Sequence, residues 1–562
     1  MRYHLSLKSV LTWTSLGIFF FFVFTVFVVC YGNEGGWTTI GLEEAKTVDN
    51  DDIETRITPQ RMGSGVVWGT AQPRAVPQPA PIPATTPLTV PVAPSAKPAL
   101  PNTASVAVPA PTPAAPALPS AAPSRPAPGM AAPQPLPQPA VRTPTPGKYL
   151  LQSARQRGST DLVETLLEVT GEAIQFTADL KEAREKMEVV AGFRYEERIE
   201  QFSPVGQLSS IRQYNLAKSK MKIGESLRMP ELANELQTIV SVIEQDRVEL
   251  FSPHGSLRSE ELLLIENIPG NTLTIDRLLP NTEVAIGESW KISDSVLRSF
   301  LSVDAVLASN IEAVLTAVAD NMAMVEIVGD VSGVYLGSST EMSVRAKFQF
   351  DLSIQRINWL GAIIEETRSI GHVGPGLEHT ARLQVKISPL ETPQALTNAA
   401  MMTVSTRPNP AVLQLKYDGG KGPWRFSHDR SWYVYQDDPQ ATVLRKLMNG
   451  ELVAQCNIAD MGTVDLQTMT TLEKFQQDLI AGLGENFGRI AAATEYENRR
   501  GYKIYKVLLD GMVDDLALRW IYHLITDRDG RQSVVVFVVE ASMFESFGDA
   551  DEALLETYRM GR

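Results

Sequence analysis

The chain has 562 residues, two cysteines and a formal charge of −14, from 51 Lys and Arg against 65 Asp and Glu. Two cysteines exclude a disulfide scaffold and a zinc site built from cysteine ligands. Residues 1–147 hold nine basic and seven acidic residues, so residues 148–562 hold the other 42 and 58. A body this acidic repels phosphate backbones, and we therefore expect no binding to nucleic acid.

The N-terminal sequence predicts a membrane element at residues 10–31. No charged residue occurs in Val10–Tyr31, and a helix of this length spans about 33 Å, enough for the hydrocarbon core of a bilayer. Arg2 and Lys8 precede the run and the next charges are acidic, which predicts a cytoplasmic tail at residues 1–9 and a body outside the membrane. A cleaved signal peptide is the alternative. The body is therefore expected to be exported, either anchored at the membrane with its bulk in the periplasm or at the cell surface, or secreted after cleavage.

A polar segment at residues 32–72 leads into a linker rich in Pro and Ala at residues 73–147. Pro73–Pro146 holds 24 of the chain's 37 prolines and has no aromatic or acidic residue. Proline at this density removes backbone donors and fixes φ, so we expect a disordered spacer that samples polyproline II. Proline-recognition motifs occur in such a composition by chance, and a spacer is the favoured interpretation.

Residues 148–388 alternate apolar and polar side chains with the period of a half-buried strand. Glu341–Leu352 shows this most clearly, with Met342, Phe348 and Phe350 on the apolar face. Ser259 is expected to cap a short helix, and a second short helix is expected after Ser293, while Leu162–Ile174 fits helix and strand equally. Further strands are predicted at Met187–Tyr195, Leu236–Val242, Arg247–Phe251, Met322–Tyr335, Ile357–Ile370 and Arg382–Ile387. The segment predicts a mainly antiparallel β meander domain.

Residues 389–410 form a predicted interdomain linker, after which the pattern changes. Thr470–Glu473 predicts a capping box that opens an amphipathic helix ending near Gly484. A second box, begun by Asp549, predicts a final helix. Between the helices, strands are predicted at Arg489–Glu497, Tyr502–Asp510, Leu516–Ile525 and Ser533–Glu540, with hairpin turns at residues 498–501 and 527–530.

The apolar run Val534–Val539 predicts a strand that is covered on both faces. The expected fold class is therefore α+β: a β meander domain at residues 148–388, followed by a smaller α-β-α sandwich with an antiparallel sheet at residues 411–562.

The order of elements at residues 411–562 resembles the PsbP-like fold, an α-β-α sandwich. The features that carry the resemblance are the strand at Trp432–Tyr435, the turn at Gly501 and the segment VVVFVVEASMF that begins at Val534. The resemblance implies a protein that binds partners and brings no catalytic residues. Residues 148–388, with Glu283–Trp290 and Phe350-Asp351, look similar to uncharacterised exported bacterial proteins, which implies no function.

Four groups of residues could carry chemistry, and none predicts a site. His372 and His379, with Glu378 beside the second, could hold zinc, but their spacing fits neither a helical pair nor a strand pair. Ser427-His428-Asp429 contains the residue types of a triad, yet neighbours in an extended chain point to opposite sides.

The same alternation prevents Glu365 and Glu366 from acting as an acid/base pair. Asp527–Gly530 lacks the ligand spacing of a calcium loop and reads as a hairpin turn. Cys456 is expected to be a buried small apolar residue. We therefore predict no catalytic, cofactor-binding or metal-binding residue and no cofactor, which favours a protein without enzymatic activity while leaving an enzyme open.

Three functions remain, and the first is preferred. It is an envelope-tethered binding protein with an unknown protein partner, attached to the membrane by its N-terminal helix. The second is a carrier of an apolar ligand in the β-rich domain, which requires a cavity lined by Met342, Phe348 and Phe350 in place of a filled core. The third is a hydrolase with scattered site residues, which a cleft gathering Glu365 with His372 or His379 would support. The sequence does not predict the oligomeric state.

Overall fold

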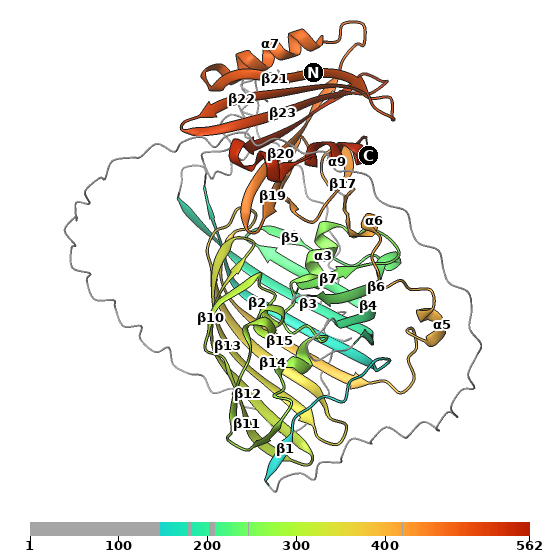
Figure 1. The fold of residues 1–562 in the computed structure, drawn as a ribbon, viewed down its shortest axis with the longest axis vertical. Helices are drawn as coiled ribbons and strands as arrows, with labels where there is room; N and C mark the ends of the chain where they lie inside the picture. The colour runs from blue at the N-terminus through green and yellow to red at the C-terminus, as the bar shows by residue number, and fades with distance from the viewer. Residues whose placement is uncertain (1–146, 178–180, 202–207, 245–246, 419, 562) are drawn as a thin grey trace, which may run out of the picture. The chain divides into compact units, whose positions relative to one another are not determined.

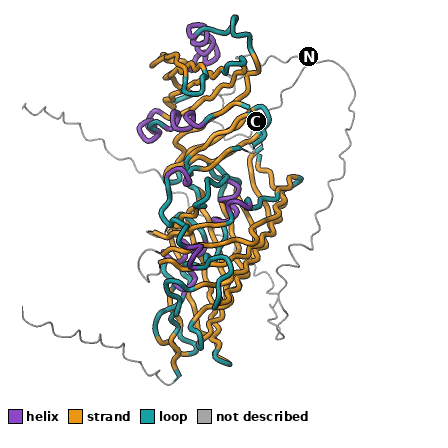
Figure 2. Tube along the Cα trace, turned by 90° about the vertical axis from the view of Figure 1, so that its right-hand side faces the viewer, coloured by secondary structure: helices purple, strands orange, loops and turns teal. Residues whose placement is uncertain are grey.

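The computed structural model describes residues 147–561 except 178–180, 202–207, 245–246 and 419. The predicted membrane element and the Pro-rich linker lie outside the described residues. The described chain is predominantly β, with short helices between and beside antiparallel sheets (Figures 1 and 2). None of the helices in this part of the chain has both the length and the apolar composition needed to cross a bilayer.

Thirteen strands of residues 160–389 form one antiparallel sheet. They are β2 (Thr160–Phe176), β3 (Glu182–Gln201), β4 (Leu208–Ile223), β5 (Ser226–Arg228), β6 (Thr238–Glu244), β7 (Arg247–Phe251), β9 (Ser289–Lys291), β10 (Ala305–Ser309), β11 (Glu312–Ala319), β12 (Met322–Tyr335), β13 (Ser338–Asp351), β14 (Arg356–Arg368) and β15 (Gly376–Pro389). The order β7-β6-β4-β3-β2-β15-β14-β13-β12-β11-β9 joins an early and a late meander by pairing β2 with β15. The predicted meander is therefore confirmed in part, because that central pair is not sequential.

One face of this sheet, which we call the inner face, carries the side chains that form the main core. The segment after β7 lies against it through α3 (Ser259–Glu266), η2 (Ile275–Leu278) and α4 (Asp294–Leu301), whose apolar side chains belong to the same cluster as those of β12–β15. A small two-stranded sheet of β1 (Lys148–Leu150) and β8 (Glu283–Ala285) and a short η1 (Asn234–Leu236) complete this part of the chain. The opposite, outer face carries charged side chains.

The period-two prediction is confirmed on β13. Phe348 and Phe350 are fully buried, while Glu341 and Arg345 on the alternate positions are exposed. The segment that fitted helix and strand equally is strand β2, because it completes hydrogen-bond ladders with both β3 and β15. The apolar side chains of β13 thus fill a packed core.

The segment after β15 is fixed to this sheet by one carboxylate. Glu196 accepts hydrogen bonds from the backbone N–H groups of residues 394, 395 and 396, at 3.0–3.2 Å. Leu396 packs with Phe251 in a small apolar cluster. Two one-turn helices follow, α5 (Asn398–Met401) and α6 (Pro410–Leu413).

The C-terminal part contains two further sheets. The larger has seven antiparallel strands in the order β18-β19-β20-β24-β23-β22-β21, and the smaller has three in the order β16-β17-β25. The seven are β18 (Trp432–Asp437), β19 (Ala441–Met448), β20 (Glu451–Thr463), β21 (Phe487–Glu497), β22 (Lys503–Val513), β23 (Leu516–Thr526) and β24 (Arg531–Glu540). The three are β16 (Leu415–Tyr417), β17 (Trp424–His428) and β25 (Arg559–Met560). The four predicted strands and both hairpins are present within the larger sheet.

The predicted α-β-α sandwich is wrong, and with it the α+β fold class, because strands dominate this region too. β24 is buried on both faces, as its apolar run required. On the face of Phe537, the core cluster contains Phe547 of α8 (Phe544–Phe547), whose ring contacts that of Phe537, and Leu554 and Leu555 of α9 (Ala550–Thr557). Tyr417, Trp424 and Phe426 of the three-stranded sheet belong to the same cluster. The other face packs on α7 (Leu472–Leu483). The remaining helical pieces are η3 (Gly484–Asn486) and η4 (Ala541–Met543).

The helices begin one residue away from some predicted caps. Thr471, not Thr470, caps α7 by accepting a bond from the Lys474 N–H at 3.2 Å. Asp549 precedes α9 but its side chain makes no capping bond, so the second predicted capping box is wrong. The helix expected after Ser293 is α4, and Ser293 caps it. Ser259 is the first residue of α3 and not its cap, because Arg258 occupies the cap position. The sequence thus predicted where these helices occur, but not which residue caps each of them.

Candidate functional site

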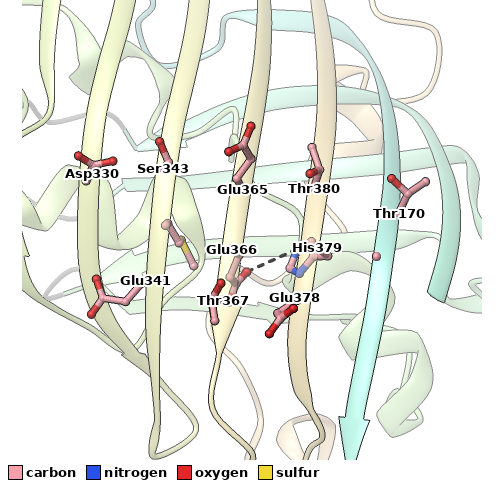
Figure 3. Close-up of a pocket in the computed structure, with 12 residues that line it drawn as sticks. Thr170, Asp330, Glu341, Ser343, Glu365, Glu366, Thr367, Glu378, His379 and Thr380 are labelled. Atoms are coloured by element: carbon pink, nitrogen blue, oxygen red, sulfur yellow. Dashed lines mark ion pairs between the residues drawn. The ribbon is translucent and has the colours of Figure 1, made fainter. Parts of the chain in front are cut away.

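An open hollow of about 620 Å³ crosses β12, β13, β14, β15 and β2 on the large sheet. The backbone ladder aligns its residues in rows across these strands (Figure 3). Two outer rows direct side chains to the outer face: Asp330, Ser343, Glu365, Thr380 and Thr170 in one, and Glu341, Thr367 and Glu378 in the other. Between them an inner row forms the floor: Met342, Glu366, His379 and Gly171. We call this feature the acidic hollow, because four carboxylates line its outer rows.

Two of the four carboxylates have cationic partners. Glu378 accepts two bonds from the guanidinium of Arg184, at 2.8 and 3.0 Å. This bond lowers the pKa of Glu378, so the group stays ionised well into the acid range. Glu365 pairs with Arg345 on the neighbouring strand. All of these side chains are exposed to water, so each pair contributes little to stability.

The other two carboxylates, Asp330 and Glu341, have only neutral partners among the described residues. Glu341 accepts a hydrogen bond from the Ser332 hydroxyl at 2.6 Å. Asp330 accepts a long bond of 3.5 Å from the Asn310 amide. No Lys or Arg side chain of the described chain pairs with either group, so the acidic hollow has an excess of negative charge.

Two residues of the floor, Glu366 and His379, point their side chains to the inner face and form a pair there. The His379 Nε2 atom lies 3.5 Å from a Glu366 oxygen. Glu366 also accepts bonds of 2.7 Å from the Thr340 hydroxyl and from Arg368 Nε. The Nδ1 atom of His379 is buried and has no hydrogen-bond partner among the described residues. Burial lowers the pKa of His379, Glu366 opposes that shift and Arg368 adds to it.

The structure brings Glu365 and His379 to the same hollow, as the hydrolase hypothesis required, but places their side chains on opposite faces. Successive residues of a strand alternate between faces, so Glu365 and Glu378 point outward while Glu366 and His379 point inward. The sheet itself separates the acids of the hollow from the histidine. An exposed carboxylate and a buried imidazole in this arrangement cannot exchange a proton directly.

The other predicted candidates are dispersed. His372 lies in the loop between β14 and β15, and no three metal-ligating side chains of the described residues converge on a metal site. His428 is buried with its Nδ1 atom 2.9 Å from the Asp429 carbonyl oxygen, while the backbone N–H of Ser427 donates to Thr557. Asp527 closes a turn by accepting bonds from its own loop.

The structure also brings together groups that the sequence did not suggest. Lys446 Nζ lies 2.5 Å from the Ser431 hydroxyl, which resembles a nucleophile beside its base. However, Lys446 also forms an ion pair with Asp429 at 3.1 Å, and Ser431 donates its own hydroxyl hydrogen bond to the same carboxylate. These residues stabilise the turn between β17 and β18.

The acidic hollow was missed by sequence reasoning, although its parts were visible. Asp330 and Glu341 occupy outward positions of two period-two strands, a pattern that predicts solvent exposure and nothing more. Only the pairing of β2 with β15, distant in the sequence, places Thr170 beside residues 378–380. The acidic hollow could have been predicted only if the order of the strands in the sheet had been known.

No family model and no curated protein matches the chain. Among solved structures, cyanobacterial PsbP (CyanoP) from Synechocystis sp. PCC 6803 matches with 14% identity and a TM-score of 0.22, over 26% of this chain and 92% of that one. A lipovitellin structure matches with 8% identity and a TM-score of 0.25, over 43% of this chain and 26% of that one, so this chain spans about a quarter of its length. An outer membrane channel from Pseudomonas putida F1 has 8% identity and a TM-score of 0.10, over 69% of this chain and 97% of that one. The match to PsbP, whose fold residues 411–562 resemble in sequence pattern, thus covers about a quarter of this chain.

Proposed function

We propose that the chain is a non-enzymatic binding protein of the cell envelope that binds a basic segment of a protein partner in the acidic hollow. The observation that carries this proposal is the pair Asp330 and Glu341, two exposed carboxylates in one hollow with no cationic partner in the described chain. A Lys or Arg side chain would supply the missing charge.

The form of the hollow favours a protein segment over a small apolar molecule. Its volume falls within the range of ligand pockets, about 300–1,000 Å³, but those are enclosed and mainly apolar. This hollow is open and lined by carboxylates and hydroxyls. Arg and Lys on a flexible segment could reach these groups without leaving water, and the excess charge would accelerate their encounter.

The filled core supports a binding surface rather than an internal carrier site. Met342, Phe348 and Phe350, which would line an apolar cavity, pack in the main core cluster instead. An apolar ligand in that position would have to displace those side chains.

The tether is part of the same proposal and rests on the sequence. The uncharged run Val10–Tyr31 would hold the chain at the membrane, and the Pro-rich segment at residues 73–147 would let the β-rich part search for its partner away from the bilayer. Protease added outside intact spheroplasts should then digest the body. Protection until lysis would contradict this topology.

A basic peptide probe tests the hollow itself. We expect fluorescence anisotropy to show binding of a labelled hexa-arginine peptide to the full chain, weakening as salt is added. Asp330→Asn combined with Glu341→Gln should weaken binding about tenfold or more. The control is Glu168→Gln, which removes an exposed carboxylate of β2 outside the hollow. Equal loss in both variants, or no binding by the unmodified chain, would contradict the proposal.

A further inference from the structure

The Glu366–His379 pair lies directly behind the acidic hollow, on the inner face of the same strands. His379 follows Glu378 in the chain, and Glu366 follows Glu365, so each member of the pair is adjacent to a carboxylate of the acidic hollow. Glu378 and Glu365 point to the outer face, whereas His379 and Glu366 point to the inner face. A charge gained by His379 therefore lies one residue away from the charges that would hold a basic partner.

We propose, on the basis of the proposed function, that protonation of His379 weakens cation binding in the acidic hollow and so releases the basic partner on acidification. The Nδ1 atom of His379 is the site that would take the proton, since it is buried without a partner in the described chain while Nε2 faces Glu366. The imidazolium would remain beside Glu366 and would add one positive charge behind the floor.

The groups that face His379 do not cancel this charge. On β14, Glu366 is already paired with Arg368, whose guanidinium also bonds it at 2.6 Å, so the two together are neutral. On β2, the residue opposite His379 is Gly171, which has no side chain. Leu377 and Ala381, the nearest inward positions of β15, are apolar. Glu366 and Arg368 are thus the charged groups that act on His379, and a proton on the imidazole adds one positive charge to this neutral pair. Farther along the inner face, Arg368 stacks on Tyr335, which Glu266 and Asp304 also face.

The bond from Arg184 keeps the pKa of Glu378 below its usual range, so Glu378 remains ionised where an imidazole takes up a proton. Burial lowers the pKa of His379, so the change falls on the acid side of 6.5, its ordinary value. We therefore expect His379 to gain its charge on the acid side of 6.5, while Glu378 is still ionised.

The test measures the affinity of the hexa-arginine peptide for the full chain at pH 7.5 and pH 5.0. One unit charge at this separation predicts that binding weakens about three- to tenfold at the lower pH. In His379→Asn the ratio of the two affinities should fall close to one. His254→Asn, which alters an exposed histidine elsewhere on the chain, should keep the ratio of the unmodified chain.

A second variant keeps the test valid if His379→Asn fails to fold, which circular dichroism would reveal. Glu366→Gln removes the carboxylate that favours the imidazolium, so the pH at which affinity changes should move lower. An unaltered pH dependence in both variants would overturn the inference while leaving peptide binding intact. Absence of binding at pH 7.5 in the unmodified chain would overturn the proposed function instead, so the two failures are distinguishable.

Discussion

Arg155 provides a sharp test of how the large sheet is held together. Its guanidinium pairs with three buried carboxylates: Asp161 at 3.1 Å, Glu197 at 3.0 Å and Asp276 at 3.2 Å. It also donates a bond of 2.7 Å to the Thr272 carbonyl oxygen, which fixes the loop before η2 to the sheet. None of these acids is more than 5% exposed. Arg155 thus neutralises a charge cluster from which water is excluded.

Arg155→Met keeps the volume of the side chain and removes its charge. Two other arginines remain in the cluster, Arg212 on Glu197 and Arg356 on Asp161, so three carboxylates are left with two cations. Breaking a buried pair in this way costs about 3–5 kcal/mol, because an uncompensated charge stays in the interior. We expect the free energy of unfolding, measured in urea by tryptophan fluorescence, to fall by that amount at pH 7.

The loss of unfolding free energy in Arg155→Met should become smaller as the pH falls. Burial raises the pKa of Asp161, and Arg155 opposes that shift, so the variant raises this pKa further. A carboxylate whose folded pKa is raised takes up a proton more readily in the folded state, so the variant should regain stability as the pH falls from 7 toward 3.8. The control Arg345→Met removes an exposed ion pair and should cost less than about 0.5 kcal/mol. Equal costs for both variants would refute burial of the cluster.

Three further predictions concern individual positions. Burial would raise the pKa of Asp551, but bonds from His523 and Lys506 lower it to about 2, so Asp551→Asn should destabilise the chain at pH 7. In urea unfolding, that difference should disappear as the pH falls from 3.8 toward 2. Phe537→Asp buries an unpaired charge and should abolish amide-exchange protection of β24. Gly171→Ala places a Cβ 2.2 Å from the Glu378 carbonyl oxygen and should lower the melting temperature, whereas Gly374→Ala meets no atom within 4 Å and should not.

Local patterns in the sequence predicted most of the strands but not the layers they form. The alternation of Glu341–Leu352 sets which side chains of β13 are buried, and the double apolar run at Val534–Val539 sets the burial of β24 on both faces. Neither pattern predicts which element packs on the buried face. The three-stranded sheet, whose side chains share the core cluster of Phe537, is made of short strands. One of them, β25, has two residues and is too brief for any periodicity to be detected. The predicted sandwich was therefore wrong because this region holds short strands, in addition to its helices, that no local pattern revealed.

The acidic hollow could not be predicted for a different reason. Its residues come from five strands spread over residues 170–380, and they meet because of backbone register. The sequence identified Glu365, Glu378 and His379 separately, but their relation depends on strand parity and on the β2–β15 pair. Parity was predictable from alternation, and it correctly separated Glu365 from Glu366. The strand order was not predictable, because no local signal joins β2 to β15.

The outer face as a whole shows why the hollow stands out. Elsewhere on this face, acids pair with bases of adjacent strands, as in Lys347 with Glu326 at 2.7 Å and Arg194 with Glu164 at 3.6 Å. Such cross-strand pairs keep a large sheet face soluble and in register. At the hollow the pattern fails: Glu378 lies directly opposite Glu172, an unfavourable pairing of like charges.

Arg184 bridges those two acids, yet Asp330 and Glu341 nearby have no such cation in the described chain. Charge repulsion of this kind weakens the folded state, and a sequence that only had to fold could remove it by one substitution to Lys or Gln at either position. Local disagreement with the folding pattern is expected at functional sites, where stability is given up for binding. Under the proposed function, a basic partner would relieve this repulsion on binding. The same charges that destabilise the free sheet would therefore contribute directly to the affinity of the complex.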